Sequence, residues 1–196
     1  MKICVYGASS NEIDKKYLDA GFALGLAMAK RGHALVFGGG NTGLMGAVAR
    51  GVHAGGGKVI GIAPRFFRVD GILYGDCDEW IYTATMRERK EAMEKHSDAF
   101  LTTPGGIGTL DEFFEIFTLR QLDRHHKPIA LLNTAGYFNP ISEMLQNMAK
   151  DRFLTENCLQ LLKISPDPEE ILDFVEQNPA KELSGTILKF LEDEET

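Results

Sequence analysis

The chain has 196 residues, of which 44% are hydrophobic and 25% charged, and its formal net charge is −7. This length and hydrophobic content predict a single folded domain and exclude an intrinsically disordered chain. The acidic balance argues against a general nucleic-acid-binding protein, because such domains usually carry a basic face.

Short apolar runs alternate with longer helical patterns along the chain. Strands are predicted at 3–6, 34–37, 59–62, 80–82, 99–102, 129–132 and 161–164, and helices near 13–30, 43–54, 85–96, 109–122, 140–150 and 167–177. Strands separated by helices are typical of a parallel sheet, and continuous apolar strands indicate helices on both of its faces. We therefore expect an α/β fold: one Rossmann-like domain over residues 1–178 with a sheet of about seven strands, then a C-terminal helix and acidic tail over 179–196.

A glycine-rich loop, Gly38-Gly39-Gly40-Asn41-Thr42-Gly43, follows the second predicted strand. Gly38, Gly40 and Gly43 fit the pattern GxGxxG, but a dinucleotide site also needs an acidic residue roughly 20 positions further on. The next strand ends Ile62-Ala63-Pro64 without one, which argues against NAD. A P-loop is excluded because the Gly-Lys-Ser/Thr ending is missing.

A second loop, Pro104-Gly105-Gly106-Ile107-Gly108-Thr109-Leu110-Asp111-Glu112, connects the strand at 99–102 to a helix. Glycines let the backbone pass close to a ligand, and the free N–H groups of a helix N-terminus favour an anion. Both loops follow the carboxyl ends of strands, where parallel sheets bind ligands. Tight turns alone would explain one such loop, whereas two at the same edge favour a ligand that carries phosphate.

The segment before that strand places two cations on an apolar helix face. Met86 and Met93 share a face at i and i+7, and Arg89 and Lys90 lie between them on the same stripe. A cation on the inward stripe needs an anionic partner, because desolvation is otherwise costly. The alternatives are side chains that extend along the apolar surface to water, or a structural ion pair.

Glu112 has two interpretations of equal weight. Thr109-Leu110-Asp111-Glu112 matches a capping box, in which Thr109 caps the helix and Glu112 binds back to the cap N–H. The other interpretation is a catalytic carboxylate beside the ligand.

The helix predicted at 109–122 is apolar around nearly its whole circumference. It must therefore be buried on more than one side, in the domain or against a second subunit. We expect Phe113, Phe114 and Phe117 to form a costly exposed patch in a monomer. The apolar side chains are Leu110, Phe113, Phe114, Ile116, Phe117, Leu119 and Leu122.

Other features exclude several classes of site. Cys4, Cys77 and Cys158 form no CxxC pair, and His125-His126 has no further ligand cluster, so neither a disulfide framework nor a metal site is predicted. No apolar run approaches the roughly 20 residues that cross a bilayer, and the N-terminal run is too short for a signal peptide. We expect a cytoplasmic protein without nucleic-acid or membrane partners.

These motifs resemble the LONELY GUY (LOG) family of cytokinin riboside 5′-monophosphate phosphoribohydrolases, whose members are often mislabelled as lysine decarboxylases. The resemblance rests on Pro104-Gly105-Gly106-x-Gly108-Thr109-x-x-Glu112 and Met86-x-x-Arg89-Lys90-x-x-Met93, and it extends from about Ile3 to Val175. It implies a Rossmann-like fold, a homodimer or higher homo-oligomer, and hydrolysis of the N-glycosidic bond of a purine nucleoside 5′-monophosphate. The products would be the free base and ribose 5-phosphate, with no cofactor and no metal.

The resemblance also implies roles for individual residues. Arg89 and Glu112 match the catalytic pair of the family, and Lys90, Gly106, Gly108, Thr109 and Thr118 match positions that contact the ligand. From the rest of the two loops we expect further substrate contacts at Gly40, Thr42, Gly43, Met45, Gly105, Ile107, Leu110 and Asp111.

One position departs from the family, and one alternative function stays open. Gly71 stands where plant-type members carry a ligand-contacting Glu, so AMP and a cytokinin nucleotide are both candidate substrates. The alternative is a non-catalytic carrier of a nucleotide or phosphorylated cofactor. A lysine decarboxylase would need a lysine that binds pyridoxal phosphate, and only Lys90 is near the site.

Overall fold

A computed structural model describes residues 1–179 of the chain. Strands and helices alternate as predicted, and the short helix α6 and two 3-10 turns, η1 (Arg65–Phe67) and η2 (Thr134–Gly136), are additional. The helix and tail expected over 179–196 lie outside the described residues, apart from residue 179. The strands and α-helices are β1 (Lys2–Tyr6), α1 (Lys15–Lys30), β2 (Ala34–Phe37), α2 (Gly43–Ala54), β3 (Val59–Pro64), β4 (Glu79–Thr83), α3 (Met86–Lys95), β5 (Ala99–Thr102), α4 (Ile107–Gln121), β6 (Ile129–Leu132), α5 (Asn139–Lys150), α6 (Glu156–Leu159), β7 (Leu162–Ser165) and α7 (Pro168–Gln177).

The seven strands form one sheet in the order β4-β3-β2-β1-β5-β6-β7, and every neighbouring pair is parallel. The predicted α/β fold with a seven-stranded parallel sheet is therefore confirmed. The chain adds strands on one side of β1 up to β4 and then crosses to β5 on the other side. This reversal of strand order puts a topological switch point at the carboxyl ends of β1 and β5, where open α/β sheets bind ligands.

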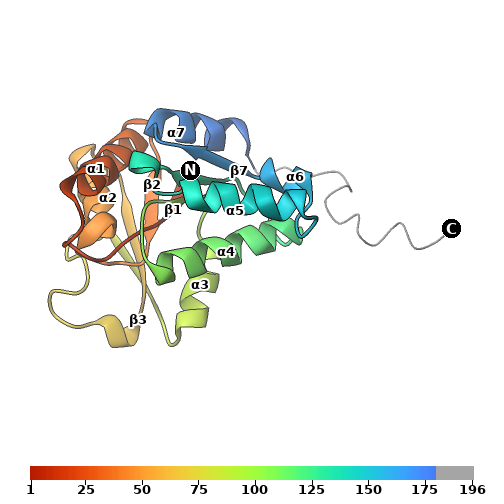
Figure 1. Cartoon of the computed structure of the whole chain (residues 1–196). Coiled ribbons are helices and arrows are strands. Elements are labelled where there is room, and N and C mark those ends of the chain that lie inside the picture. Colours follow the sequence, from red (N-terminus) through yellow and green to blue (C-terminus); the bar gives the residue numbers. More distant parts are fainter. Residues whose placement is uncertain (180–196) are drawn as a thin grey trace.

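Two hydrophobic cores cover the two faces of the sheet, as Figure 1 shows by its two helical layers. Successive side chains of a strand point to opposite faces. In β1, Ile3 and Val5 pack in the core beneath α1, α2 and α7, whereas Cys4 and Tyr6 pack in the core beneath α3, α4 and α5. On the second face α4 lies between α3 and α5.

Helix α4 begins two residues before the predicted start, and this changes the interpretation of its first turn. Gly106 is the N-cap residue and supplies no side-chain cap. Thr109 lies inside the helix, where it is buried against Gly105: a Cβ at Gly105 would lie 2.1 Å from Thr109 Oγ1. Of the two interpretations of Glu112, the capping box with Thr109 is therefore wrong, because the helix begins earlier, with Gly106 as its N-cap residue.

The apolar circumference of α4 is mostly covered within the single chain. Phe113 and Phe117 are only 1% and 4% exposed, so the prediction that they form an exposed patch is wrong. They stack on each other inside the second core, with ring centroids 5.6 Å apart. Ile107 and Leu122, at the two ends of α4, are the side chains left outside, at 84% and 47% exposure.

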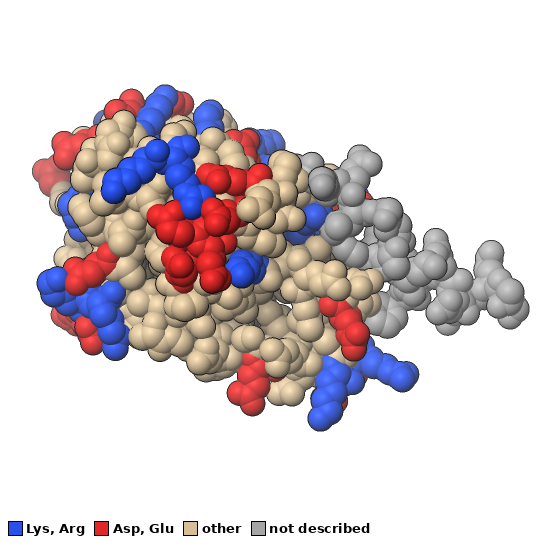
Figure 2. Space-filling view, turned by 90° about the horizontal axis from the view of Figure 1, so that it is seen from above, with Lys and Arg blue, Asp and Glu red and all other residues tan. Residues whose placement is uncertain are grey.

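Acidic side chains gather on the face that carries α7, which is the face seen in Figure 2. Arg31, at the end of α1, forms ion pairs there with Glu169, Asp173 and Glu176. These acids are thus matched by a cation that ties α7 to α1. Within residues 1–179, no helix combines the length and the apolar character needed to cross a bilayer.

Candidate active site

The loops that leave β1 and β5 meet at the switch point, where the Ala8 N–H donates a hydrogen bond to Pro104 O (3.1 Å). A cleft of about 450 Å³ opens beside them. That volume suits a small-molecule ligand such as a nucleotide. The cleft is lined by Gly7, Ala8, Ser9, Ser10, Met45, Phe67, Met86, Arg89, Lys90, Gly106, Gly108, Thr109, Asp111 and Glu112.

Arg89 and Glu112, from α3 and α4, form an ion pair in the wall of this cleft. Arg89 Nη1 lies 2.7 Å from Glu112 Oε1, and Arg89 Nε donates to Ile62 O at 3.3 Å. The two side chains are 8% and 12% exposed. The cation on the inward stripe of α3 is therefore matched by a carboxylate, and both are held where water has little access.

Gly38 makes this arrangement possible. A Cβ at that position would lie 1.9 Å from Arg89 Nη2. The guanidinium thus occupies space that any other residue at position 38 would fill. The first glycine of the GxGxxG pattern serves Arg89 and not a dinucleotide.

Burial raises the pKa of the Glu112 carboxyl above its ordinary value, and the charge and hydrogen bond of Arg89 oppose that shift. A carboxylate whose pKa is moved towards neutrality is a stronger base than a solvated one. With one oxygen held by Arg89, Glu112 can accept a proton at the surface of the cleft.

Lys90 lies next to this pair and is held by carboxylates of α4. Its Nζ lies 3.2 Å from Asp111 Oδ2 and also pairs with Glu115. The hydrogen bond to Glu115, followed by that to Asp111, raises the pKa of Lys90. Lys90 therefore stays an ammonium ion at the mouth of the cleft.

The N-terminus of α4 faces the cleft with its first-turn amides. The first bond within the helix runs from Leu110 N–H to Gly106 O, so the three preceding N–H groups lie before the helical ladder. A Cβ at Gly106 or Gly108 would meet no atom within 4 Å, which shows that the backbone is open on that side. Tyr137 donates to Gly105 O and fixes the loop. This terminus can bind an anion.

The Gly38–Gly43 loop holds neighbouring loops. The Gly43 N–H donates to Asn11 Oδ1 (2.8 Å), and Thr42 Oγ1 donates to Ser9 O (2.5 Å). The Asn41 N–H donates to Ile72 O, which joins Gly40 to the segment before β4. In the described chain Gly40, Thr42 and Gly43 support neighbouring loops and are not in the lining of the cleft, whereas Met45 is.

Some of the other predicted site residues line the cleft, and some do not. Lys90, Gly106, Gly108, Thr109 and Asp111 line the cleft together with Arg89 and Glu112. Four others are not in the lining of the cleft in the described chain. Gly105 lies beneath Thr109, and Leu110 is partly buried. Ile107 is exposed, and so is Thr118, which lies further along α4.

The sequence analysis missed the loop after β1 and the aromatic ring of Phe67. Gly7-Ala8-Ser9-Ser10 is a run of small residues directly after the first strand, and this signal could have been used. It becomes informative once β1 is known to lie beside β5. Phe67 comes from a segment without helical or strand periodicity, so no pattern pointed to it.

Comparisons with known proteins show the family of the chain. A family model described as "Possible lysine decarboxylase" matches residues 45–175. "Cytokinin riboside 5'-monophosphate phosphoribohydrolase LOG4" of Arabidopsis thaliana is 37% identical over 188 residues, which cover 95% of this chain and 87% of that protein. The LOG3 protein of the same plant, with the same described activity, is 38% identical over 176 residues, 90% of this chain and 82% of that protein.

The fold is also shared with a protein of different description. The structure of the molybdenum cofactor binding protein from the bacterium Rippkaea orientalis matches with a TM-score of 0.70 and 23% identity, over 90% of this chain and 95% of that one. This likeness shows a common fold. The family model and the identity to the plant proteins show more: the chain belongs to the LONELY GUY (LOG) family.

Proposed function

We propose that this protein hydrolyses the N-glycosidic bond of a purine nucleoside 5′-monophosphate to give the free base and ribose 5-phosphate. The observation that carries the proposal is the buried Arg89–Glu112 ion pair, which opens on a cleft beside the N-terminus of α4. The described activity of the plant relatives supports it.

Two parts of the site suit this reaction: the N-terminus of α4 and the Arg89–Glu112 pair. The first-turn amides of α4, between Gly106 and Thr109, would hold the 5′-phosphate and anchor the sugar. The C1′–N bond then breaks, its electron pair leaves with the base, and positive charge develops on the ribose. Glu112 is placed to stabilise that charge and to take a proton from the water whose hydroxyl joins C1′. The departing base takes a proton from solvent, and Glu112 then returns its own proton to solvent. Arg89 keeps Glu112 ionised and oriented.

The residues do not fit a pyridoxal phosphate enzyme, which the description of the family model would imply. Such an enzyme needs a lysine that can lose its proton and form a Schiff base. Lys90 is the one lysine among the described residues that line the cleft, and two carboxylates hold it as an ammonium ion. We therefore derive no decarboxylation from this site.

A carrier of a nucleotide or phosphorylated cofactor is the second candidate, because the molybdenum cofactor binding protein shares the fold. The buried ion pair favours the enzyme, since a carrier has no need of a desolvated carboxylate next to the ligand. AMP and a cytokinin nucleotide are both candidate substrates. We also propose a homodimer, supported by the apolar side chains left exposed on α4, and a cytoplasmic location, supported by three free thiols.

Incubation of the purified protein with AMP, a cytokinin riboside 5′-monophosphate and adenosine tests the proposal. We expect chromatography to show free base from the nucleotides. Adenosine, which lacks the phosphate anchor, should react slower by roughly 10²-fold or more. Nucleotides that bind and remain intact would instead indicate a carrier.

A further inference from the structure

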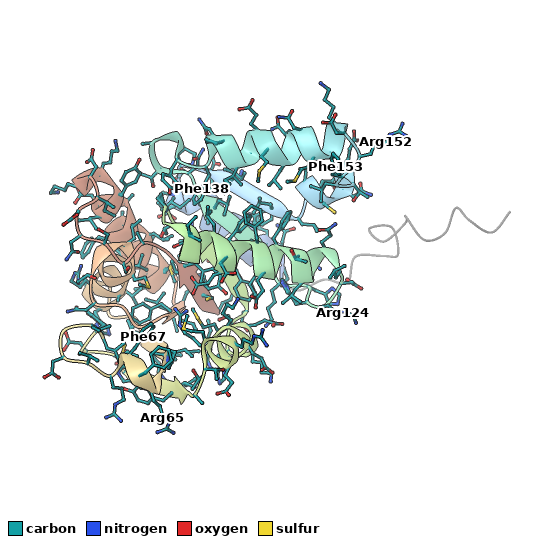
Figure 3. All side chains as sticks on the ribbon, turned by 60° about the horizontal axis from the view of Figure 1, so that its bottom comes forward. Arg65, Phe67, Arg124, Phe138, Arg152 and Phe153 are labelled. Carbon is teal, nitrogen blue, oxygen red and sulfur yellow. The ribbon has the colours of Figure 1, made fainter. Side chains whose placement is uncertain are left out.

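Among residues 65–70, Phe67 is the one whose side chain lines the cleft. Residues 65, 66 and 68–70 are exposed, whereas Phe67 is partly buried and lines the cleft. In Figure 3, Phe67 lies towards the body of the protein and Arg65, on the same 3-10 turn, points outwards. The ring of Phe66 packs edge-on against that of Phe67, with centroids 4.8 Å apart.

The segment that carries Phe67 is fixed to the Gly38–Gly43 loop and to α2. The Tyr74 N–H donates to Gly39 O (2.8 Å), next to the bond from Asn41 to Ile72. The Tyr74 hydroxyl lies 2.9 Å from His53 Nδ1. The chain that carries Phe67 is thus held on one side by β3, which ends at Pro64, and on the other by the contacts of Ile72 and Tyr74. A side chain on a short segment held at both ends loses less entropy when a ligand packs against it.

The cleft is lined by two kinds of group, which suit different parts of a nucleotide. Amides and charged groups, at Gly106–Thr109 and Lys90, suit phosphate and ribose. Met45, Phe67 and Met86 are the large apolar side chains of the lining; they carry no charge, and Phe67 has a flat aromatic face. Aromatic side chains stack on bases and tolerate different base edges.

We propose that Phe67 stacks on the base of the bound nucleotide, with Met45 and Met86 as the apolar surroundings, and that it determines affinity for the base half of the substrate. This inference rests on the proposed function, and it concerns the base alone. Stacking between Phe67 and the base would position the glycosidic bond beside Glu112 while the phosphate is held independently by α4.

Binding measured by calorimetry in a Glu112→Gln background, where turnover does not interfere, tests this assignment. Phe67→Ala should weaken AMP binding by roughly tenfold or more, the range of one base–aromatic stack. Binding of ribose 5-phosphate, which has no base, should change by less than about twofold. Phe67→Trp should restore AMP affinity. Val69→Ala, at an exposed residue two positions further on that does not line the cleft, is the control and should leave both affinities near those of the background.

The outcomes separate the two claims. If neither AMP nor ribose 5-phosphate binds in the Glu112→Gln background, the proposed function is wrong. If both bind and Phe67→Ala weakens them equally, or leaves AMP unchanged, Phe67 does not hold the base while the proposed function stands.

Discussion

Gly38 has no side chain, and the space this leaves is what positions Arg89 in its ion pair with Glu112. The residue pattern placed Arg89 on the inward face of α3, and this part of the site was predictable. The residue pattern alone did not give its partner, because Glu112 lies 23 residues away and the capping box explained it equally well. The resemblance to the LOG family supplied Glu112 as the second member of the pair. The role of Gly38 was hidden too, since the gap it leaves is filled by a side chain 51 positions further along the chain.

Gly38→Ala should therefore reduce turnover of AMP by roughly 10²-fold, the scale of a misplaced catalytic group. The new Cβ would lie 1.9 Å from Arg89 Nη2, so the guanidinium must leave and Glu112 loses its partner. Steady-state kinetics with thermal unfolding as the check on folding would measure this.

Gly75→Ala is the matched control, because a Cβ there meets no atom within 4 Å. It should keep wild-type activity. Turnover near the wild-type rate in Gly38→Ala would contradict the role given to Gly38.

Helix α4 shows what can be predicted of an element and what cannot. Its long apolar pattern predicted the helix and its deep burial. The predicted start of the helix was two residues late. Gly106, the true N-cap residue, has no side chain that would signal a cap, whereas Thr109 and Glu112 match the sequence pattern of a capping box. The pattern also could not show which apolar residues the same chain covers: Phe113 and Phe117 are covered, and Ile107 and Leu122 are not.

We expect the proposed dimer contact to include the exposed apolar residues at the two ends of α4, Ile107 and the C-cap residue Leu122. Leu122→Asp should convert the wild-type dimer into a folded monomer, because it puts a charge on a surface that a partner would bury. Phe22→Asp, at a residue of similar exposure on α1 in the other helical layer, should leave the dimer intact. Sedimentation velocity at micromolar concentration measures both. A monomeric wild-type protein would contradict the homodimer.

At the scale of the whole molecule, the order of the strands builds the site. All seven strands and their parallel pairing could be predicted, because the alternation of strand and helix is a local pattern. Their order could not, since it depends on contacts between distant segments. The order β2-β1-β5 brings Gly7–Ser10 against Pro104 and opens the cleft at the carboxyl ends of β1 and β5.

The most direct test of the central claim compares AMP hydrolysis by the wild type and by Glu112→Gln, with AMP binding measured on both. The wild type should release adenine and ribose 5-phosphate in equal amounts. The amide keeps the shape of Glu112 but cannot accept a proton, so turnover should fall by roughly 10²- to 10⁴-fold while AMP still binds. Turnover by Glu112→Gln at close to the wild-type rate would contradict the assignment of Glu112 as the catalytic carboxylate.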